Sequence, residues 1–198
     1  MTQLNTGIHV TCGCLMDKNL LPIDMTCSLV GPTVVLRPIC AEDFEPLYEA
    51  AADPLIWEQH PDRQRYQREP FRQRFFEGAI ASGSAYVVVD QASGKLVGSS
   101  RFYEWNLEAR EVAIGYTFLS RSHWGGMTNG EMKRLMLDHA FTWAQVVWFH
   151  IGRDNWRSRK ATEKVGAVFS HEAPKELSGI LVDYTFYRID ADNYRKRS

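Results

Sequence analysis

The sequence lacks the long hydrophobic runs from which membrane-spanning helices are built. None of its apolar stretches approaches the roughly 18 residues needed to cross a bilayer. The first ten residues also lack the basic and apolar regions of a secretory signal. We therefore expect a cytoplasmic protein with no membrane partner.

An excess of charge of one sign is also missing. The 198 residues include 23 Lys and Arg against 24 Asp and Glu, which gives a formal net charge of -1. A nucleic-acid-binding surface would require an excess of basic side chains. The composition therefore argues against a nucleic-acid partner.

Cysteine is scarce, and its four positions all lie in the first forty residues. Cys12 and Cys14, with His9 nearby, offer ligands for a metal, but no second pair follows at a zinc-finger spacing. We predict reduced thiols and no metal site.

The chain has enough apolar residues, 44% of the total, to bury the core of one domain. Residues 1–30 show no clear period, whereas the pattern sharpens from Thr33 onwards. We expect an N-terminal extension over residues 1–30 and one domain over residues 31–198.

Hydrophobic periodicity predicts strands that alternate with helices. The predicted strands cover residues 33–37, 85–90, 96–103, 110–119, 146–151, 168–172 and 181–189, with a hairpin turn around residues 175–179. The predicted helices cover residues 41–52, 69–82, about 131–145 and 158–165. This order predicts a mixed α/β (α+β) fold with one right-handed β-α-β crossover.

The longest predicted strand, residues 110–119, alternates strictly between two faces. One face is apolar and is expected in the core: Val112, Ile114, Tyr116 and Phe118. The other face is small: Glu111, Ala113, Gly115 and Thr117. The small face leaves space beside the strand for a ligand.

A glycine-rich segment, residues 120–130, follows this strand and leads into a helix. Free amide groups and the helix dipole make such a loop suited to phosphate. It is neither a Walker A loop, because Gly130 precedes Glu131 and Met132, nor a dinucleotide-binding fingerprint in a first strand-helix unit. From these residues alone, a phosphate site and an ordinary turn both remain open.

Several further motifs stand in a consistent order. They are Val35-Leu36-Arg37-Pro38, Asp43-Phe44, Ile114-Gly115-Tyr116, the loop of residues 122–131, Asn155-Trp156-Arg157-Ser158 and residues 163–167. Together they resemble the GNAT superfamily of acyl-CoA N-acyltransferases, in particular the branch that acetylates ribosomal-protein N-termini. The resemblance covers about residues 29–188. It implies a mostly antiparallel sheet of about seven strands, splayed between the fourth and fifth and flanked by about four helices.

The resemblance also implies a function. The chain would transfer acetyl from acetyl-CoA to a primary amine, on a protein N-terminus or a small molecule, by direct attack in a ternary complex. The residues implied to bind the cofactor are Phe118, Leu119, Ser120, Trp124, Gly125, Gly126, Met127, Thr128, Asn129, Gly130, Asn155 and Ser158. Met127 departs from the small residue usual in that loop, so its side chain must turn away from the diphosphate.

Two residues are candidates for catalysis under this resemblance. Glu111 lies on the small face of the strand and is the candidate base, with a water relay or a purely structural ion pair as alternatives. Ser158 is the candidate donor to the leaving thiolate, with a helix-capping role as the alternative. Ala113 and Thr162 stand where many relatives have an acidic residue and a tyrosine.

The resemblance also implies that the acceptor amine is enclosed by the loop between the first two helices, residues 57–66, and by the final hairpin, about residues 175–184. The candidate substrate-binding residues are Trp57, His60, Tyr66, Arg101 and Tyr103. Arg63, Arg65, Arg68, Arg72 and Arg74 are expected to form a solvated face, with a pocket for an acidic acceptor such as a peptide end as the alternative. Exposed Trp105 and Trp156 permit a homodimer. Two alternative functions remain. One is an inactive acyl-CoA sensor. The other is a nucleotide-binding protein, although the sequence lacks the Walker A and dinucleotide-binding motifs.

Overall fold

The computed structural model describes residues 21–177 and 179–196. Its centre is an eight-stranded sheet with the order β1-β2-β3-β4-β5-β6-β8-β7. The strands are β1 (Leu29–Val30), β2 (Val34–Pro38), β3 (Ala85–Asp90), β4 (Leu96–Asn106), β5 (Glu111–Leu119), β6 (Val146–Gly152), β7 (Val168–Leu177) and β8 (Ile180–Asp190). All neighbouring strands are antiparallel except β5 and β6. The predicted fold class is confirmed, with one strand more than expected.

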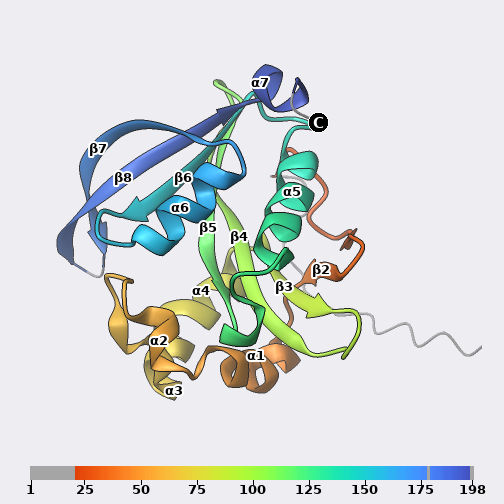
Figure 1. Cartoon of the computed structure of the whole chain (residues 1–198), viewed down its shortest axis with the longest axis vertical. Helices are drawn as coiled ribbons and strands as arrows, with labels where there is room; N and C mark the ends of the chain where they lie inside the picture. The colour runs from red at the N-terminus through yellow and green to blue at the C-terminus, as the bar shows by residue number, and fades with distance from the viewer. Residues whose placement is uncertain (1–20, 178, 197–198) are drawn as a thin grey trace, which may run out of the picture.

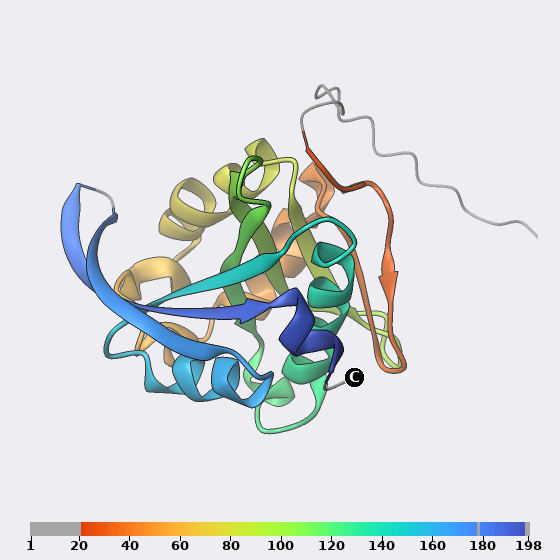
Figure 2. The ribbon, with the colours of Figure 1, turned by 90° about the horizontal axis from the view of Figure 1, so that it is seen from above.

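Helices cover both faces of this sheet (Figures 1 and 2). On one face lie α5 (Thr128–Ala140) and α6 (Trp156–Lys164). On the other face lie α1 (Phe44–Ala51), α2 (Pro54–Trp57), α3 (Arg68–Phe71) and α4 (Glu77–Ala81), with a π-helical turn, η3 (Arg72–Phe76), between the last two. Short 3₁₀ turns are η1 (Ala41–Asp43), η2 (Arg63–Tyr66) and η4 (Arg121–His123), and α7 (Ala191–Arg195) follows β8.

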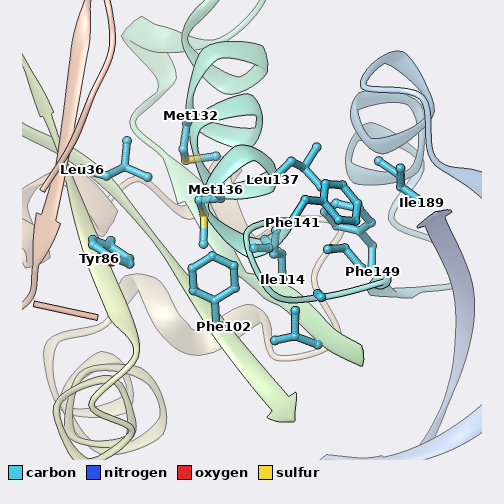
Figure 3. Close-up of a cluster of buried hydrophobic side chains, with 14 of the residues drawn as sticks. Leu36, Tyr86, Phe102, Ile114, Met132, Met136, Leu137, Phe141, Phe149 and Ile189 are labelled. Atoms are coloured by element: carbon cyan, nitrogen blue, oxygen red, sulfur yellow. The ribbon is translucent and has the colours of Figure 1, made fainter. Parts of the chain in front are cut away.

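Two hydrophobic clusters, one on each face, hold these layers together. Under α5, Met132 and Met136 point at the sheet toward Phe102, as Figure 3 shows. Across the sheet, aromatic rings dominate: Trp57 and Phe71 of the helices surround Phe118 of β5 with ring centroids 5.3 and 6.0 Å away. β5 therefore contributes side chains to both clusters.

The packed structure begins before residue 31. Leu29 and Val30 pair with β2, and Ile23 and Met25 are buried in the cluster under α5. The first strand was not predicted because two residues are too few to show a period. His9, Cys12 and Cys14 lie outside the described residues.

Several predicted elements differ in extent from the observed ones. The helix predicted to run to residue 145 ends at Ala140, and residues 141–143 form a turn. The last two strands are longer than predicted, so most of the expected turn at residues 175–179 is strand. The connection predicted after Trp57 contains η2, and the chain closes with α7, which was not predicted. No helix in the described part of the chain is long and apolar enough to span a bilayer.

The β-α-β crossover is confirmed and it positions the site. β5, α5 and β6 form the unit, and β5 runs parallel to β6. The two strands pair at Glu111–Val146, Val112–Val147 and Ala113–Trp148, and pair no further. Beyond Ala113 they diverge, which confirms the predicted splay.

Candidate active site

The gap between the diverging strands opens into a cavity of about 130 Å³. It is lined by Trp57, His60, Pro61, Arg65, Tyr103, Ile114, Gly115, Tyr116, Thr117, Lys133, Phe149, His150, Ile151, Gly152, Asn155, Ser158, Thr162, Lys175, Glu176, Leu177 and Tyr184. Five of the predicted site residues are in this set: Trp57, His60, Tyr103, Asn155 and Ser158. Beyond Ala113, no described strand pairs with the edge of β5 that faces the gap.

A β-bulge interrupts β5 inside this cavity. Ser99 pairs with Phe118 and Arg101 with Gly115, so two residues of β5 face one of β4. Tyr116 has a φ of 51°, and its side chain is 38% exposed rather than buried. The predicted strict alternation is therefore wrong from Tyr116 onwards. Phe118 consequently packs on the opposite face of the sheet from Ile114.

The loop before α5 is open for an anion. Within the described part of the chain, the amide N–H groups of residues 125–130 donate no hydrogen bond, and the first bond of the helix runs from Glu131 to the Met127 carbonyl. Gly125 has a φ of 75°, and a Cβ at Gly125 or Gly126 would meet no atom within 4 Å. The Met127 side chain is 74% exposed, so it does not fold into the loop.

Trp124 links this loop to the sheet and to α6. Its indole N–H donates to the Leu119 carbonyl at 2.9 Å, and the Arg157 guanidinium lies 4.0 Å from its ring centroid. Arg157 also donates to the Ile56 carbonyl at 2.6 Å. Sequence reasoning missed Arg157, whose partners are about 100 residues away along the chain. At the end of β5, Ser120 donates its N–H to Val97.

Asn155 and Ser158 face the cavity from the start of α6. The Asn155 side-chain oxygen accepts the Ser158 N–H at 3.2 Å, so Asn155 caps the helix. Ser158 is therefore not the capping residue, and its hydroxyl is left to face the cavity. Thr162, one turn further, also lines the cavity.

Glu111 does not line the cavity. It lies where β5 and β6 still pair, and its carboxylate accepts the Trp148 indole N–H at 3.0 Å. The strand places Glu111 and Gly115 on one face, as predicted, but the closed end of the gap separates Glu111 from a bound amine. The position of Glu111 does not support a role as base.

The acceptor side of the cavity is lined by the segment between α2 and α3. His60 accepts the Asp62 N–H on Nδ1, and burial beside Arg65 lowers the pKa of His60 to about 3. Arg65 is 3% exposed and pairs with Asp62 at 3.2 Å. The expectation of a solvated Arg65 is wrong, because its guanidinium is enclosed by Trp57 and Phe75.

A second polar group lies across the cavity on the sheet. His150 Nδ1 is 2.8 Å from Lys175 Nζ and 3.5 Å from a Glu104 carboxylate oxygen. Burial, followed by the Lys175 charge, lowers the pKa of His150 to about 4. Its imidazole is therefore neutral at neutral pH. Lys175 also pairs with Glu104.

Two predicted substrate-binding residues do not line the cavity. Tyr66 packs against the aromatic cluster instead. Arg101 is 9% exposed, donates to the Gly78 carbonyl at 2.6 Å and lies 3.5 Å from the centroid of the Tyr116 ring. Arg101 thus positions Tyr116. Trp105, predicted exposed, is half-buried against Phe102 and Trp143, whereas Trp156 is 55% exposed.

The family is decided by a match to the model described as "Acetyltransferase (GNAT) domain", which spans residues 33–168. The chain belongs to the GNAT acetyltransferase family. The predicted resemblance and the predicted enzyme class, an acyltransferase, are confirmed. A search of curated protein sequences finds no match to this chain.

Solved structures of other GNAT proteins share the fold. A GCN5-related N-acetyltransferase from Brucella melitensis is 18% identical with a TM-score of 0.78, covering 88% of this chain and 83% of that one. An acetyltransferase of the GNAT family from Bacillus anthracis is 16% identical with a TM-score of 0.70, covering 84% and 99%. RimL, a ribosomal L7/L12 alpha-N-protein acetyltransferase solved with coenzyme A, is 17% identical with a TM-score of 0.67, covering 84% and 99%.

Among residues 21–177 and 179–196, no group of three or more His, Cys, Asp or Glu side chains is arranged to hold a metal ion.

Proposed function

We propose that this GNAT protein transfers an acetyl group from acetyl-CoA to a primary amine, by direct attack of the amine in a ternary complex, in the cytoplasm. The observation that supports this proposal is the cavity in the gap between β5 and β6, together with the free amides of residues 125–130 in the loop that follows β5. Free amides meet the diphosphate at one end, and the unpaired edge of β5 meets the pantetheine arm along the gap.

Each side of the gap has a distinct part in this proposal. Asn155 has its side-chain nitrogen available for the arm, because its oxygen caps α6. Ser158 donates a hydrogen bond to the thiolate as the C–S bond breaks. His150 replaces Glu111 as the candidate proton acceptor, since it lines the cavity and the Glu104 carboxylate, 3.5 Å from its Nδ1, would stabilise the protonated imidazole. His60, Trp57 and Tyr103 border the amine.

The acceptor is a protein N-terminus or a small-molecule amine. RimL, which shares the fold, acts on a protein N-terminus, and the acceptor side here opens beneath the β7–β8 hairpin. A panel of amines, including N-terminal peptides, identifies the acceptor by the release of free thiol. Size measurement in solution tests the homodimer that exposed Trp156 permits.

Asn129→Asp is expected to weaken the binding of coenzyme A about tenfold or more. The new carboxylate lies in the first turn of α5, where it repels a bound diphosphate. An acidic residue at a helix N-terminus stabilises the free protein, so lost binding will not reflect unfolding. The matched control is Asn193→Asp on exposed α7, which should bind as wild type.

Thermal unfolding with acetyl-CoA, ATP and NAD provides the measurement. A ligand at about a hundred times its Kd adds about 2.7 kcal/mol of stability. Stabilisation by acetyl-CoA, reduced in Asn129→Asp, is the expected result. Stabilisation by ATP or NAD alone would instead support a nucleotide-binding protein. Binding of acetyl-CoA without thiol release from any amine would support the inactive sensor.

Three variants separate the proposed roles in catalysis. Ser158→Ala is expected to lower kcat about 10- to 100-fold with coenzyme A affinity unchanged, because a hydrogen bond to a charged group is lost. His150→Gln should lower kcat about 100-fold. Glu111→Gln should remain within about twofold of wild type, since the amide oxygen still accepts the Trp148 N–H. A large loss of kcat in Glu111→Gln alone would restore Glu111 as the base.

A further inference from the structure

Lys133 is a buried lysine that meets no carboxylate among the described residues. It projects from α5, is 4% exposed and lines the cavity. Within the described part of the chain its ammonium makes no hydrogen bond or ion pair, and the contact it does make is with the Phe149 ring, 4.6 Å from Nζ. Burying an unpaired ammonium costs several kcal/mol, so such groups usually meet an anion. Here the anion must come from a ligand.

The other cations of the cavity already have carboxylate partners. Arg65 pairs with Asp62, and Lys175 pairs with Glu104. Within residues 21–177 and 179–196, Lys133 is the one lysine or arginine lining the cavity that has no carboxylate partner. Arg65 and Lys175 are therefore already neutralised and do not offer a free positive charge to an anionic acceptor.

Thr162 is a second unpartnered donor beside the same space. It lies on α6, is fully buried, and its hydroxyl has no hydrogen-bond partner in the described part of the chain. An ammonium from one helix and a hydroxyl from the next can both donate to one carboxylate, which has four acceptor positions.

The direction of the gap indicates which part of a substrate reaches Lys133. The phosphate loop lies beyond Leu119, at the open end of β5, and the gap closes at Ala113 and Trp148. Phe149, the ring under Lys133, is the first residue of β6 past that last pair. A pantetheine arm that enters at the loop therefore directs its acyl group toward Lys133.

We propose that the donor site accepts CoA thioesters whose acyl group ends in a carboxylate, such as succinyl-CoA, with Lys133 and Thr162 as the carboxylate-binding pair. The inference rests on the proposed function for the coenzyme A site and the amine, and replaces only the acyl group. The amine nitrogen forms an amide bond with the acyl carbonyl carbon while the C–S bond breaks. The amine loses a proton, the thiolate of coenzyme A takes one up, and the terminal carboxylate is unchanged.

The test compares succinyl-CoA with acetyl-CoA in two assays: equilibrium binding without amine, and kcat/KM with one common amine. Wild type should prefer succinyl-CoA. Lys133→Met should lower the succinyl-to-acetyl ratio about 10- to 100-fold in both assays, as expected for a lost hydrogen bond to a charge. Thr162→Val should lower the succinyl-to-acetyl ratio by a smaller factor than Lys133→Met does. Lys160→Met, an exposed lysine on α6, is the matched control and should leave the ratio unchanged.

Two outcomes would overturn the inference, and they differ in what else they affect. If wild type binds and uses acetyl-CoA but Lys133→Met leaves the ratio unchanged, Lys133 does not select the acyl group and the proposed function stands. If wild type binds neither thioester, the proposed function fails as well. Lys133→Met removes the charge at this buried position, and urea unfolding tests whether the variant is folded.

Discussion

Gly98→Ala is expected to lower the free energy of unfolding by about 3 kcal/mol, within the upper range for an added group in a packed interior. Gly98 lies on β4 opposite Leu119, and a Cβ there would come within 2.2 Å of the Phe118 carbonyl oxygen and 2.7 Å of a Leu119 methyl. Neither group can move away easily, because the Phe118 oxygen belongs to the backbone and the Leu119 side chain is buried. The substitution therefore pushes β5 away from β4, toward the gap.

The matched control is Gly126→Ala, where a Cβ meets no atom within 4 Å. Both substitutions reduce the entropy of the unfolded chain equally, so their difference reports the clash alone. Urea unfolding of the two variants measures it. Equal midpoints would show that β4 and β5 do not approach each other as closely as the structure has them. Coenzyme A binding should also weaken in Gly98→Ala, because the displaced strand narrows the gap.

Glu131→Ala is expected to cost about 2 kcal/mol at neutral pH, because it removes the acceptor of the buried Val34 N–H and of two Thr33 donors. The Glu131 carboxylate, 7% exposed in the first turn of α5, accepts the Thr33 N–H at 2.8 Å, the Thr33 hydroxyl at 2.6 Å and the Val34 N–H at 3.0 Å. These bonds fix the N-terminal end of α5 to the start of β2. Coenzyme A binding should weaken together with stability.

The contribution of Glu131 should depend on pH. Burial alone would raise the pKa of this carboxyl, but the hydrogen bonds from Thr33 and Val34 outweigh it and hold the pKa below its ordinary value. A depressed pKa stabilises the fold above the unfolded value of about 4.3, and the contribution disappears as the pH falls through the folded value. The difference between wild type and Glu131→Ala should therefore shrink below about pH 4. Glu108→Ala, exposed in the turn after β4, should show no such difference at any pH.

The sequence predicts the order of elements well, because periodicity and glycine-rich turns are local signals. The loop of residues 124–130 and the splay depend on such signals and on a family resemblance, and both are found as predicted. Asn155 and Ser158 line the cavity for the same reason, since the start of α6 is marked in the sequence.

The features that the sequence did not predict depend on the register between paired strands and on contacts between residues far apart along the chain. One inserted residue at the Tyr116 bulge moves Phe118 to the opposite face, and no periodicity shows an insertion before the pairing with β4 is known. Glu111 shares a face with Gly115, yet it lies where the sheet is closed. From the sequence, Arg65 is predicted to be one of five exposed arginines. In the structure Trp57, Phe75 and Asp62 enclose it.

The short junction between β5 and β6 has a mechanical consequence. Backbone hydrogen bonding between the first five strands and the last three passes through three residue pairs, all at one end of both strands. The opposite ends are held together by side-chain packing under α5 and by the reach of Arg157 across to α2. A linear molecule bound along β5 would connect the two parts of the sheet, β1–β5 and β6–β8, at the ends where their strands do not pair. Its dissociation therefore requires these two parts to move apart. We expect a molecule bound along β5 to dissociate no faster than the two parts separate.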